Sequence, residues 1–176
     1  ADAQEAKEEA TGPVTKKKAT EVVSEDEEEF QEDKKELADE DKTTFADLGL
    51  EDVILDALNK KGYKFPTPIQ ENVIPLLLKG GIDVIGQAQT GTGKTAAFGL
   101  PILQNLEEGV RNTQALILAP TRELAIQVAN EINSFKGRKR LSIVTVYGGQ
   151  PIMQQIKDLN RGADIVVGTP GRVIDL

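Results

Sequence analysis

From Thr44 onward, the apolar residues alternate between helical spacing and short continuous runs. Helical spacing of apolar residues, with Pro or Gly at the boundaries, predicts helices over residues 50–61 and 122–135, and a helix that begins at Pro68 and ends before Gly80. Further helices are expected to begin at Lys94, at Pro151 and at Gly171, and the one from Lys94 is expected to bend at Pro101. Continuous apolar runs predict strands over residues 82–85, 115–119, 141–146 and 165–167, and the run ALILA at 115–119 reads as a fully buried strand. Strands that are apolar throughout and alternate with helices indicate a parallel sheet with helices on both faces, so the fold class is α/β.

The first 42 residues have a different pattern, with few large apolar side chains and an acidic run at 25–29. Such a segment cannot bury enough surface to offset the entropy of ordering it, so we predict a disordered acidic tail. The tail either keeps the protein soluble or acts as a polyanion that competes for a basic nucleic-acid groove. Residues 43–176 are predicted to form the folded part, a single domain.

The tail accounts for the acidity of the whole chain, whose net charge is −8. Residues 1–41 hold 16 Asp or Glu and 6 Lys, a net charge of −10. The remaining residues hold 13 acidic and 15 basic side chains, a net charge of +2. The acidic average therefore does not argue against nucleic-acid binding by the folded part.

Two missing residue types limit the chemistry. The chain has no Cys and no His, which excludes disulfides, thiolate metal sites and imidazole acid–base catalysis. No apolar run approaches membrane-spanning length and no signal peptide is visible, so we expect a cytoplasmic protein without a membrane partner. We expect it to be monomeric.

The sequence AQTGTGKT at 88–95 follows a predicted strand and precedes a predicted helix. Gly91 and Gly93 can adopt backbone angles that other residues avoid, and their N–H groups can surround an anion. Lys94 adds a positive charge for the outer phosphates, and Thr95 offers a hydroxyl to Mg²⁺. The alternative is a tight structural turn, but the strand–loop–helix context favours a nucleoside triphosphate site. Ala88 stands where the general G-x-x-x-x-G-K-[ST] pattern has its first glycine.

A second candidate segment is GYKFPTPIQ at 62–70. Its two prolines hold the chain extended before a helix. The Gln70 amide has the donor and acceptor needed to pair with adenine N6 and N7, and Phe65 could stack on a base. The alternative is a purely structural role, with a rigid turn, Phe65 in the core and Gln70 on the surface. Residue chemistry alone favours this alternative over nucleotide binding.

Further motifs follow in order: PTREL at 120–124, the pair Gly148-Gly149, and TPGR at 169–172. Together with AQTGTGKT and GYKFPTPIQ, these motifs resemble the amino-terminal RecA-like domain of a DEAD-box RNA helicase. The resemblance covers about residues 43–176. That family also has alanine at the position of Ala88.

The resemblance implies an ATP site and a path for one RNA strand. Phe45, 17 residues before Gly62, corresponds to the isolated upstream aromatic residue of the family, and Gln70 to its adenine-reading Gln. The residues expected at the ATP and Mg²⁺ site are Phe45, Phe65, Gln70, Ala88, Gln89, Thr90, Gly91, Thr92, Gly93, Lys94 and Thr95, with Lys94 and Thr95 catalytic and Thr95 on the metal. The residues expected along the RNA are Pro120, Thr121, Arg122, Gly148, Gly149, Thr169, Pro170, Gly171 and Arg172. Contacts of Arg, Thr and backbone groups with phosphates would make binding independent of base sequence and sensitive to salt.

The resemblance also implies parts that this sequence lacks. The family's Asp-Glu-Ala-Asp motif, which completes Mg²⁺ coordination, would follow Leu176, and a second RecA-like domain would follow that. We therefore expect a fragment of a longer helicase, open beside the phosphate-loop strand and able to bind ATP but with little means of cleaving it. Two alternatives are a non-catalytic RNA- or partner-binding module, and a DNA-directed helicase or other P-loop ATPase.

Overall fold

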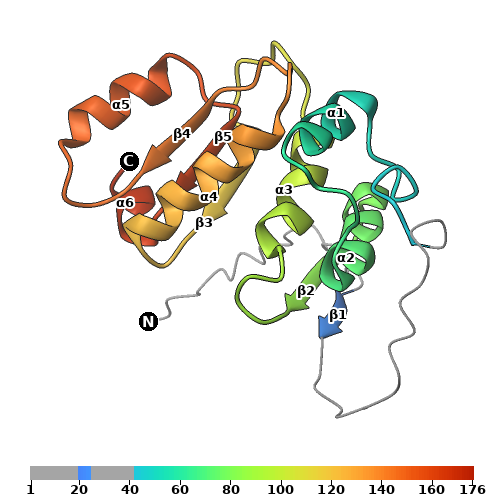
Figure 1. Ribbon diagram of the computed structural model, residues 1–176. Coiled ribbons are helices and arrows are strands. Elements are labelled where there is room, and N and C mark those ends of the chain that lie inside the picture. The colour runs from blue at the N-terminus through green and yellow to red at the C-terminus, as the bar shows by residue number, and fades with distance from the viewer. Residues whose placement is uncertain (1–19, 25–41) are drawn as a thin grey trace, which may run out of the picture.

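The computed structural model describes residues 20–24 and 42–176, and Figure 1 shows the arrangement of their helices and strands. The elements in chain order are β1 (Thr20–Ser24), α1 (Asp52–Lys60), α2 (Pro68–Lys79), β2 (Asp83–Gln87), α3 (Lys94–Asn105), β3 (Ala115–Leu118), α4 (Arg122–Phe135), β4 (Ile143–Val146), α5 (Ile152–Asn160), β5 (Ile165–Gly168) and α6 (Pro170–Asp175). Every helix and strand predicted from the sequence is present, with bounds shifted by a few residues. Within the described residues, no helix is long and apolar enough to cross a membrane.

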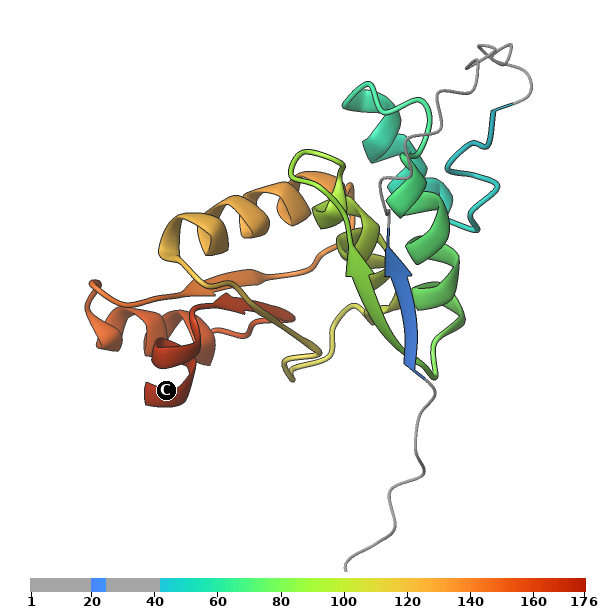
Figure 2. The same ribbon diagram turned by 90° about the horizontal axis from the view of Figure 1, so that it is seen from below.

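Three strands form a parallel sheet in the order β3-β5-β4. β5 lies in the middle, with Ile165 paired to Ala115 of β3 and to Ile143 of β4. Figure 2 shows α4 on one side of this sheet and α5 and α6 on the other. All four residues of β5 are buried because the strand has neighbours at both edges and helices over both faces. The predicted α/β class and the parallel pairing are confirmed.

β2, which leads into the phosphate loop, does not join that sheet. It pairs in parallel with β1, from Thr20 opposite Asp83 to Ser24 opposite Gln87. The described strands therefore form two parallel sheets, where the sequence predicted one.

β1 is a short strand within residues 1–42, the segment that the sequence predicts to be a disordered acidic tail. The sequence TEVVS at 20–24 is rich in β-branched residues, which favour strands, and the edge of β2 supplies its backbone partners. The average composition of the tail concealed this short segment. The other residues of 1–41 lie outside the described part of the chain.

The main core lies between the 44–50 segment, α1, α3, α4 and β5. α3 and α4 supply Leu100, Leu103, Ile132 and Phe135, none of which is exposed to solvent. The helix spacing that predicted α1 is confirmed for Ile54, Ala57 and Leu58, which are all buried. This core fixes α3 against α4, and so sets the start of each helix relative to the other.

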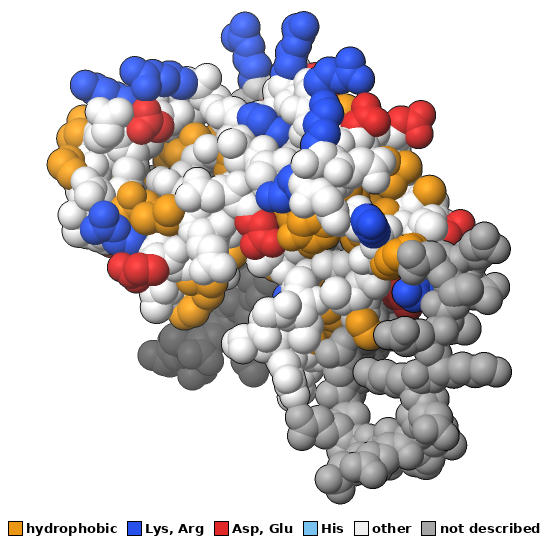
Figure 3. All heavy atoms as spheres, in the orientation of Figure 1, with side chains coloured by type: hydrophobic (Ala, Val, Ile, Leu, Met, Phe, Trp, Pro, Cys, Tyr) orange, Lys and Arg blue, Asp and Glu red, His pale blue; other side chains and the backbone are white. Residues whose placement is uncertain are grey.

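Basic side chains gather where α1 and α4 end. Figure 3 shows Lys and Arg side chains along the upper edge of the molecule. Lys60, Lys61 and Arg138 line one shallow hollow there, and Arg138 lies 3.5 Å from Asp56. Cations near the C-terminal ends of helices are stabilised by the helix dipole, so this cluster has a structural explanation.

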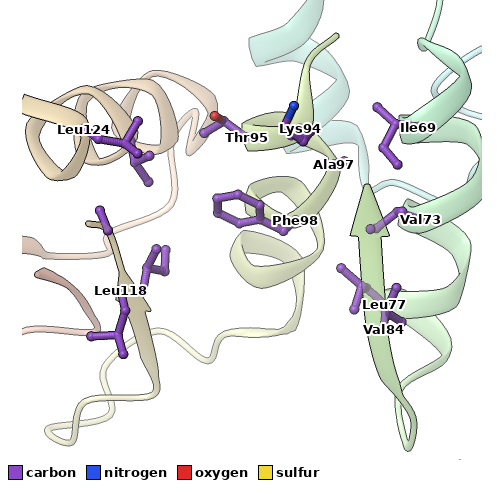
Figure 4. A pocket seen from close by; sticks show the side chains of 14 residues that line it. Ile69, Val73, Leu77, Val84, Lys94, Thr95, Ala97, Phe98, Leu118 and Leu124 are labelled. Atoms are coloured by element: carbon purple, nitrogen blue, oxygen red, sulfur yellow. The ribbon is translucent and has the colours of Figure 1, made fainter. Parts of the chain in front are cut away.

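The sequence predicted that the strand over 115–119 is fully buried, and this is wrong, because only Ala119 is buried and Ala115 and Ile117 are half-buried. Leu116 and Leu118 are 54% and 55% exposed, whereas Ile117 packs against the main core. Leu118 lines an apolar cleft of about 480 Å³ between the β2–α2 side and the β3–α4 side of the molecule. Figure 4 shows Phe98 of α3 in the middle of this cleft, with Leu124 on one wall and Val73 on the other. The cleft exposes one face of β3 because no described element covers it.

Replacing Leu118 with lysine is expected to reduce the binding of a hydrophobic dye, because it places a charge in the apolar cleft. The side chain is already half exposed, so its replacement should change the free energy of unfolding by less than about 1 kcal/mol. Dye fluorescence and denaturant unfolding measure the two effects. Ile174→Lys is the matched control, because Ile174 is 84% exposed and lies outside the cleft. An equal effect of both substitutions would contradict a specific role of the cleft.

Candidate nucleotide and RNA site

The phosphate loop lies between the end of β2 at Gln87 and the start of α3 at Lys94. Gly91 and Gly93 have φ angles of +84° and +88°, which residues with a side chain rarely adopt. Gly93 is the N-cap of α3, and it has no side chain that could cap the first N–H groups of that helix. Uncapped N–H groups at a helix N-terminus bind anions well, so the loop has the geometry of a phosphate site.

The Lys94 ammonium group folds back over this loop. It donates hydrogen bonds to the carbonyl oxygens of Ala88 and Gln89. The Thr92 hydroxyl donates to the same Gln89 carbonyl at 2.9 Å. Lys94 therefore places its charge inside the loop, next to the N-terminus of α3, where a phosphate oxygen could replace a carbonyl oxygen as its partner.

The segment at 62–70 is tied directly to the phosphate loop. The Gln70 amide group accepts a hydrogen bond from the Thr67 N–H at 3.0 Å and donates one to the Gly93 carbonyl at 3.1 Å. The Thr67 hydroxyl donates to the Thr92 carbonyl at 2.7 Å. Gln70 is only 1% exposed. In this structure Gln70 positions the loop, and its adenine-reading role stays a prediction.

The close approach of Gln70 explains why residue 93 is glycine. A Cβ atom built on Gly93 would lie 2.2 Å from Gln70 Nε2. Sequence reasoning missed Thr67, although the spacing T-x-x-Q at 67–70 is the signature of a helix capping box and could have revealed it.

The two aromatic residues predicted to contact the nucleotide lie in different surroundings. Phe45 is 4% exposed and packs in the core, with its ring centroid 6.4 Å from that of Tyr63. Its place at the nucleotide site stays a prediction. Phe65 is half-buried, and the Lys42 ammonium lies 5.1 Å from its ring centroid.

The apolar cleft joins the phosphate loop to the loop that follows β3. Lys94 and Thr95 line one end of the cleft, and Leu124 lies across it (Figure 4). Thr95 is half-buried at this end. The nucleotide and RNA residues predicted from the sequence therefore lie on the same side of the molecule.

The residues predicted to contact RNA meet at one edge of the β3-β5-β4 sheet. The motifs at 120–124, 148–149 and 169–172 follow β3, β4 and β5 respectively, and the carboxyl ends of parallel strands lie at the same edge. Most of these residues are exposed there, namely Pro120, Thr121, Arg122, Gly148, Gly149, Pro170 and Gly171.

Two arginines connect these three loops. The Arg122 guanidinium group lies 4.9 Å from the centre of the Tyr147 ring, which precedes the Gly148-Gly149 pair. Arg172 donates from Nη1 to the Gln150 carbonyl at 3.1 Å, and its side chain is only 12% exposed. Arg122 is thus open to a ligand, whereas Arg172 mainly holds the glycine loop in place. Phosphate binding by Arg172 stays a prediction.

The Thr residues of the motifs at 120–124 and 169–172 are the N-cap residues of helices. Thr121 is the N-cap of α4, and its hydroxyl accepts a hydrogen bond from the Leu124 N–H at 3.3 Å. Thr169 is the N-cap of α6, and its N–H donates to the Val146 carbonyl at 3.0 Å, which ties β5 to β4. Helix N-termini attract phosphates, which suits α4 with its 14 residues.

Acidic groups contribute little to the site. Within the described residues, no group of three or more His, Cys, Asp or Glu side chains could hold a metal ion. Burial raises the pKa of Tyr63, and the charge of Glu131 raises it further. Hydrogen bonds from the Thr44 hydroxyl and backbone N–H lower the pKa of Asp47. Neither group is among the predicted site residues, so the electrostatics of the site come from Lys94, Arg122 and the helix N-termini.

Comparisons with known proteins point to one family. The family model described as "DEAD/DEAH box helicase" matches residues 67–176. Over 133 residues the chain is 52% identical to the ATP-dependent RNA helicase CshA of Listeria monocytogenes, covering 76% of this chain and 25% of that protein. Over 134 residues it is 56% identical to the ATP-dependent RNA helicase DeaD of Escherichia coli, covering 76% of this chain and 21% of that protein. The chain therefore spans about a quarter of the length of these relatives.

Solved structures give the same result for the fold. A DEAD box protein from the hyperthermophile Methanococcus jannaschii matches with a TM-score of 0.72 and 52% identity, over 75% of this chain and 36% of that one. A hypothetical ATP-dependent RNA helicase from Sulfolobus tokodaii matches with a TM-score of 0.65 and 41% identity, over 72% of this chain and 36% of that one. The RecA-like fold predicted from the motifs is confirmed by these similarities.

Proposed function

Because the chain belongs to the DEAD/DEAH box helicase family, we propose that it supplies the ATP-binding and RNA-contacting surface of an ATP-dependent RNA helicase. The observation that carries this proposal is the phosphate loop, in which Lys94 reaches over two glycines of positive φ at the uncapped N-terminus of α3. The whole helicase would separate short RNA duplexes with a second RecA-like domain.

In the nucleotide complex, the Lys94 ammonium exchanges the Ala88 and Gln89 carbonyls for oxygens of the outer phosphates. The N–H groups at the start of α3 bind the same phosphates, and Gln70 keeps Gly93 in place through its carbonyl. The Thr95 hydroxyl would hold Mg²⁺, which would neutralise charge on the transferring phosphoryl group. Lys94 and Thr95 are therefore the residues to which we assign catalytic roles.

The RNA strand crosses the edge formed by the loops after β3, β4 and β5. Arg122 binds a phosphate, the exposed Gly148-Gly149 pair allows close approach of the backbone, and the N-terminus of α4 contributes its N–H groups. These contacts involve phosphates and not base edges. Binding should therefore be independent of base sequence and weaken as salt rises.

Replacing Lys94 with alanine is expected to weaken ATP binding about ten- to hundred-fold, since hydrogen bonds to charged groups contribute about 1.5–3 kcal/mol. Titration of a fluorescent ATP analogue in Mg²⁺ buffer measures the affinity. Lys79→Ala is the matched control, because Lys79 is exposed at the end of α2, away from the loop. Unchanged affinity of the Lys94 variant would overturn the nucleotide site.

Phosphate release with and without RNA separates the enzymatic proposal from its alternative, a non-catalytic RNA- or partner-binding module. RNA-stimulated release by the complete protein supports a helicase, and stimulation by DNA instead of RNA would favour a DNA-directed enzyme. ATP and RNA binding without turnover by the complete protein would support the module.

A further inference from the structure

A second positively charged surface lies where α1 and α4 end, and Figure 3 shows its Lys and Arg side chains along the upper edge of the molecule. We call it the basic edge and define it by Lys60 and Lys61 at the end of α1 and by Arg138 and Arg140 after α4. All four residues are exposed. None of them is among the residues predicted to contact the nucleotide or the RNA.

The basic edge lies at the other end of α4 from the proposed RNA path. α4 begins at Arg122, beside the carboxyl end of β3, and ends at Phe135, three residues before Arg138. The 14 residues of this helix rise by roughly 21 Å in total. A nucleotide bound at Arg122 therefore does not reach the basic edge, which is open to a different part of the same RNA.

Close packing between α1 and the loop after α4 holds these cations together. A Cβ atom on Gly137 would lie 2.6 Å from the Val53 carbonyl oxygen, so the loop lies directly against α1. The Lys139 ammonium donates a hydrogen bond to the Leu103 carbonyl at 2.8 Å, which ties the same loop to α3. The basic edge is therefore a fixed arrangement of charges on packed elements.

Most of the positive charge of the basic edge is not neutralised by the protein itself. Among the residues that the structure describes, no carboxylate forms an ion pair with Lys60, Lys61 or Arg140. Arg138 lies 3.5 Å from Asp56, but the two side chains are 84% and 56% exposed, and exposed ion pairs contribute little. The helix dipole stabilises cations in the last turn of α1, but its effect does not extend to the arginines beyond the end of α4.

A hollow of about 250 Å³ lies between these cations. Its lining is rich in hydrogen-bond donors, namely Lys60, Lys61, Asn133, Ser134 and Arg138. Lys61 donates from Nζ to the Ser134 hydroxyl at 2.5 Å, and the lining also includes one carboxylate, that of Asp56. Three cations against one carboxylate, with a hydroxyl and an amide beside them, favour an anion with several oxygen acceptors. A phosphate group is such an anion.

The aromatic rings beside the basic edge indicate which kind of nucleic acid it suits. Proteins that bind single strands stack the bases on exposed aromatic rings. Here Phe135 is fully buried, with its ring centroid 5.6 Å from that of Tyr63, and the Lys61 ammonium lies 4.7 Å from the Phe135 centroid. Cations over covered rings suit a ligand that presents phosphates and no unpaired bases, as an RNA duplex does.

From this arrangement we propose that the basic edge binds the phosphate backbone of an RNA duplex, with one phosphate in the hollow between α1 and the loop after α4. The proposal rests on the RNA path proposed above, because the duplex and the single strand at Arg122 belong to one RNA. Two sites that bind one RNA raise its overall affinity without a new contact at either site. Because the contacts are with phosphates, the basic edge holds duplexes of any sequence.

The test compares a labelled RNA single strand of about 10 nucleotides with the same strand joined to an RNA hairpin of about 12 base pairs, by fluorescence anisotropy. The wild-type chain should bind the hairpin probe about ten-fold more tightly at low salt, with a salt slope steeper by about one for each further phosphate neutralised. The double variant Lys60→Glu/Arg138→Glu should lose most of this advantage and keep its affinity for the single strand.

Lys79→Glu/Arg161→Glu is the matched control. Lys79 lies in the last turn of α2, and Arg161 is an exposed arginine 2.8 Å from Asp158, so this double variant makes the same change of charge away from the basic edge. It should keep the wild-type advantage of the hairpin probe. Unchanged binding of the single strand shows that each variant is folded, and the wild-type salt slopes test the proposal without any substitution.

Equal wild-type affinity for the two probes, or an equal loss in the two double variants, would overturn the duplex contact while leaving the proposed function intact. A hairpin advantage that appears only after residues 1–41 are removed would also overturn it, because the acidic segment would then be the ligand of the basic edge in the intact chain. Failure of the wild-type chain to bind the single strand would instead count against the proposed RNA path itself.

Discussion

Replacing Gly93 with alanine is expected to lower the free energy of unfolding by about 2–4 kcal/mol and to abolish detectable nucleotide binding. Gly93 has a φ angle of +88°, where a residue with a Cβ is destabilised by about 1–2 kcal/mol. The new Cβ would also lie 2.2 Å from Gln70 Nε2 and displace the amide that bonds the Gly93 carbonyl. Denaturant unfolding and titration with a fluorescent ATP analogue measure the two effects.

Gly91→Ala is the matched control for this substitution. Gly91 has a φ angle of +84°, but a Cβ there would meet no atom within 4 Å. This variant should show only the backbone penalty of about 1–2 kcal/mol. If the two variants lost the same stability and the same affinity, the contact between Gln70 and the loop would have no role in holding the site together.

Replacing Arg122 with glutamate is expected to weaken binding to single-stranded RNA by more than about ten-fold at low salt. The substitution removes a cation at the start of α4 and places a negative charge on the proposed phosphate path. It should also reduce the slope of log affinity against log salt by about one, since one fewer phosphate is neutralised. RNA titrations at several salt concentrations measure both quantities.

Arg111→Glu controls for the change in net charge. Arg111 is also exposed, but it lies before β3 and so at the opposite edge of the sheet from Arg122. It should have a much smaller effect on RNA affinity. Equal losses in the two variants would show that RNA responds to the overall charge of the protein and not to the edge at the carboxyl ends of the strands.

Local sequence was enough to predict most elements because their signals are short-range. Apolar residues three and four positions apart predicted the helix at Asp52–Lys60. Gly91 and Gly93 predicted the tight loop that leads into α3. The motifs at 120–124, 148–149 and 169–172 were assigned to one RNA path through the family resemblance, and their place at one edge of the sheet comes from the structure.

Contacts between distant residues were not predictable in the same way. Burial of Phe45 against Tyr63 depends on how the 44–50 segment packs on α1 and α4. The strand at Thr20–Ser24 forms because the edge of β2 is there to pair with it. Exposure of Leu116 and Leu118 depends on which elements cover β3. Each outcome is decided by neighbours that lie far away in the sequence.

The sequence by itself determined the α/β class, the strand–loop–helix around AQTGTGKT and the residue types that can bind phosphates. Tertiary structure alone decided that Gln70 is buried against Gly93 and that Arg172 holds the Gln150 carbonyl while Arg122 stays exposed. The physical reason is that a motif fixes the chemistry of a side chain, whereas its burial and hydrogen-bond partners depend on packing between elements. Only that packing decides whether an amide or guanidinium group is free to bind a ligand or is already hydrogen-bonded within the protein.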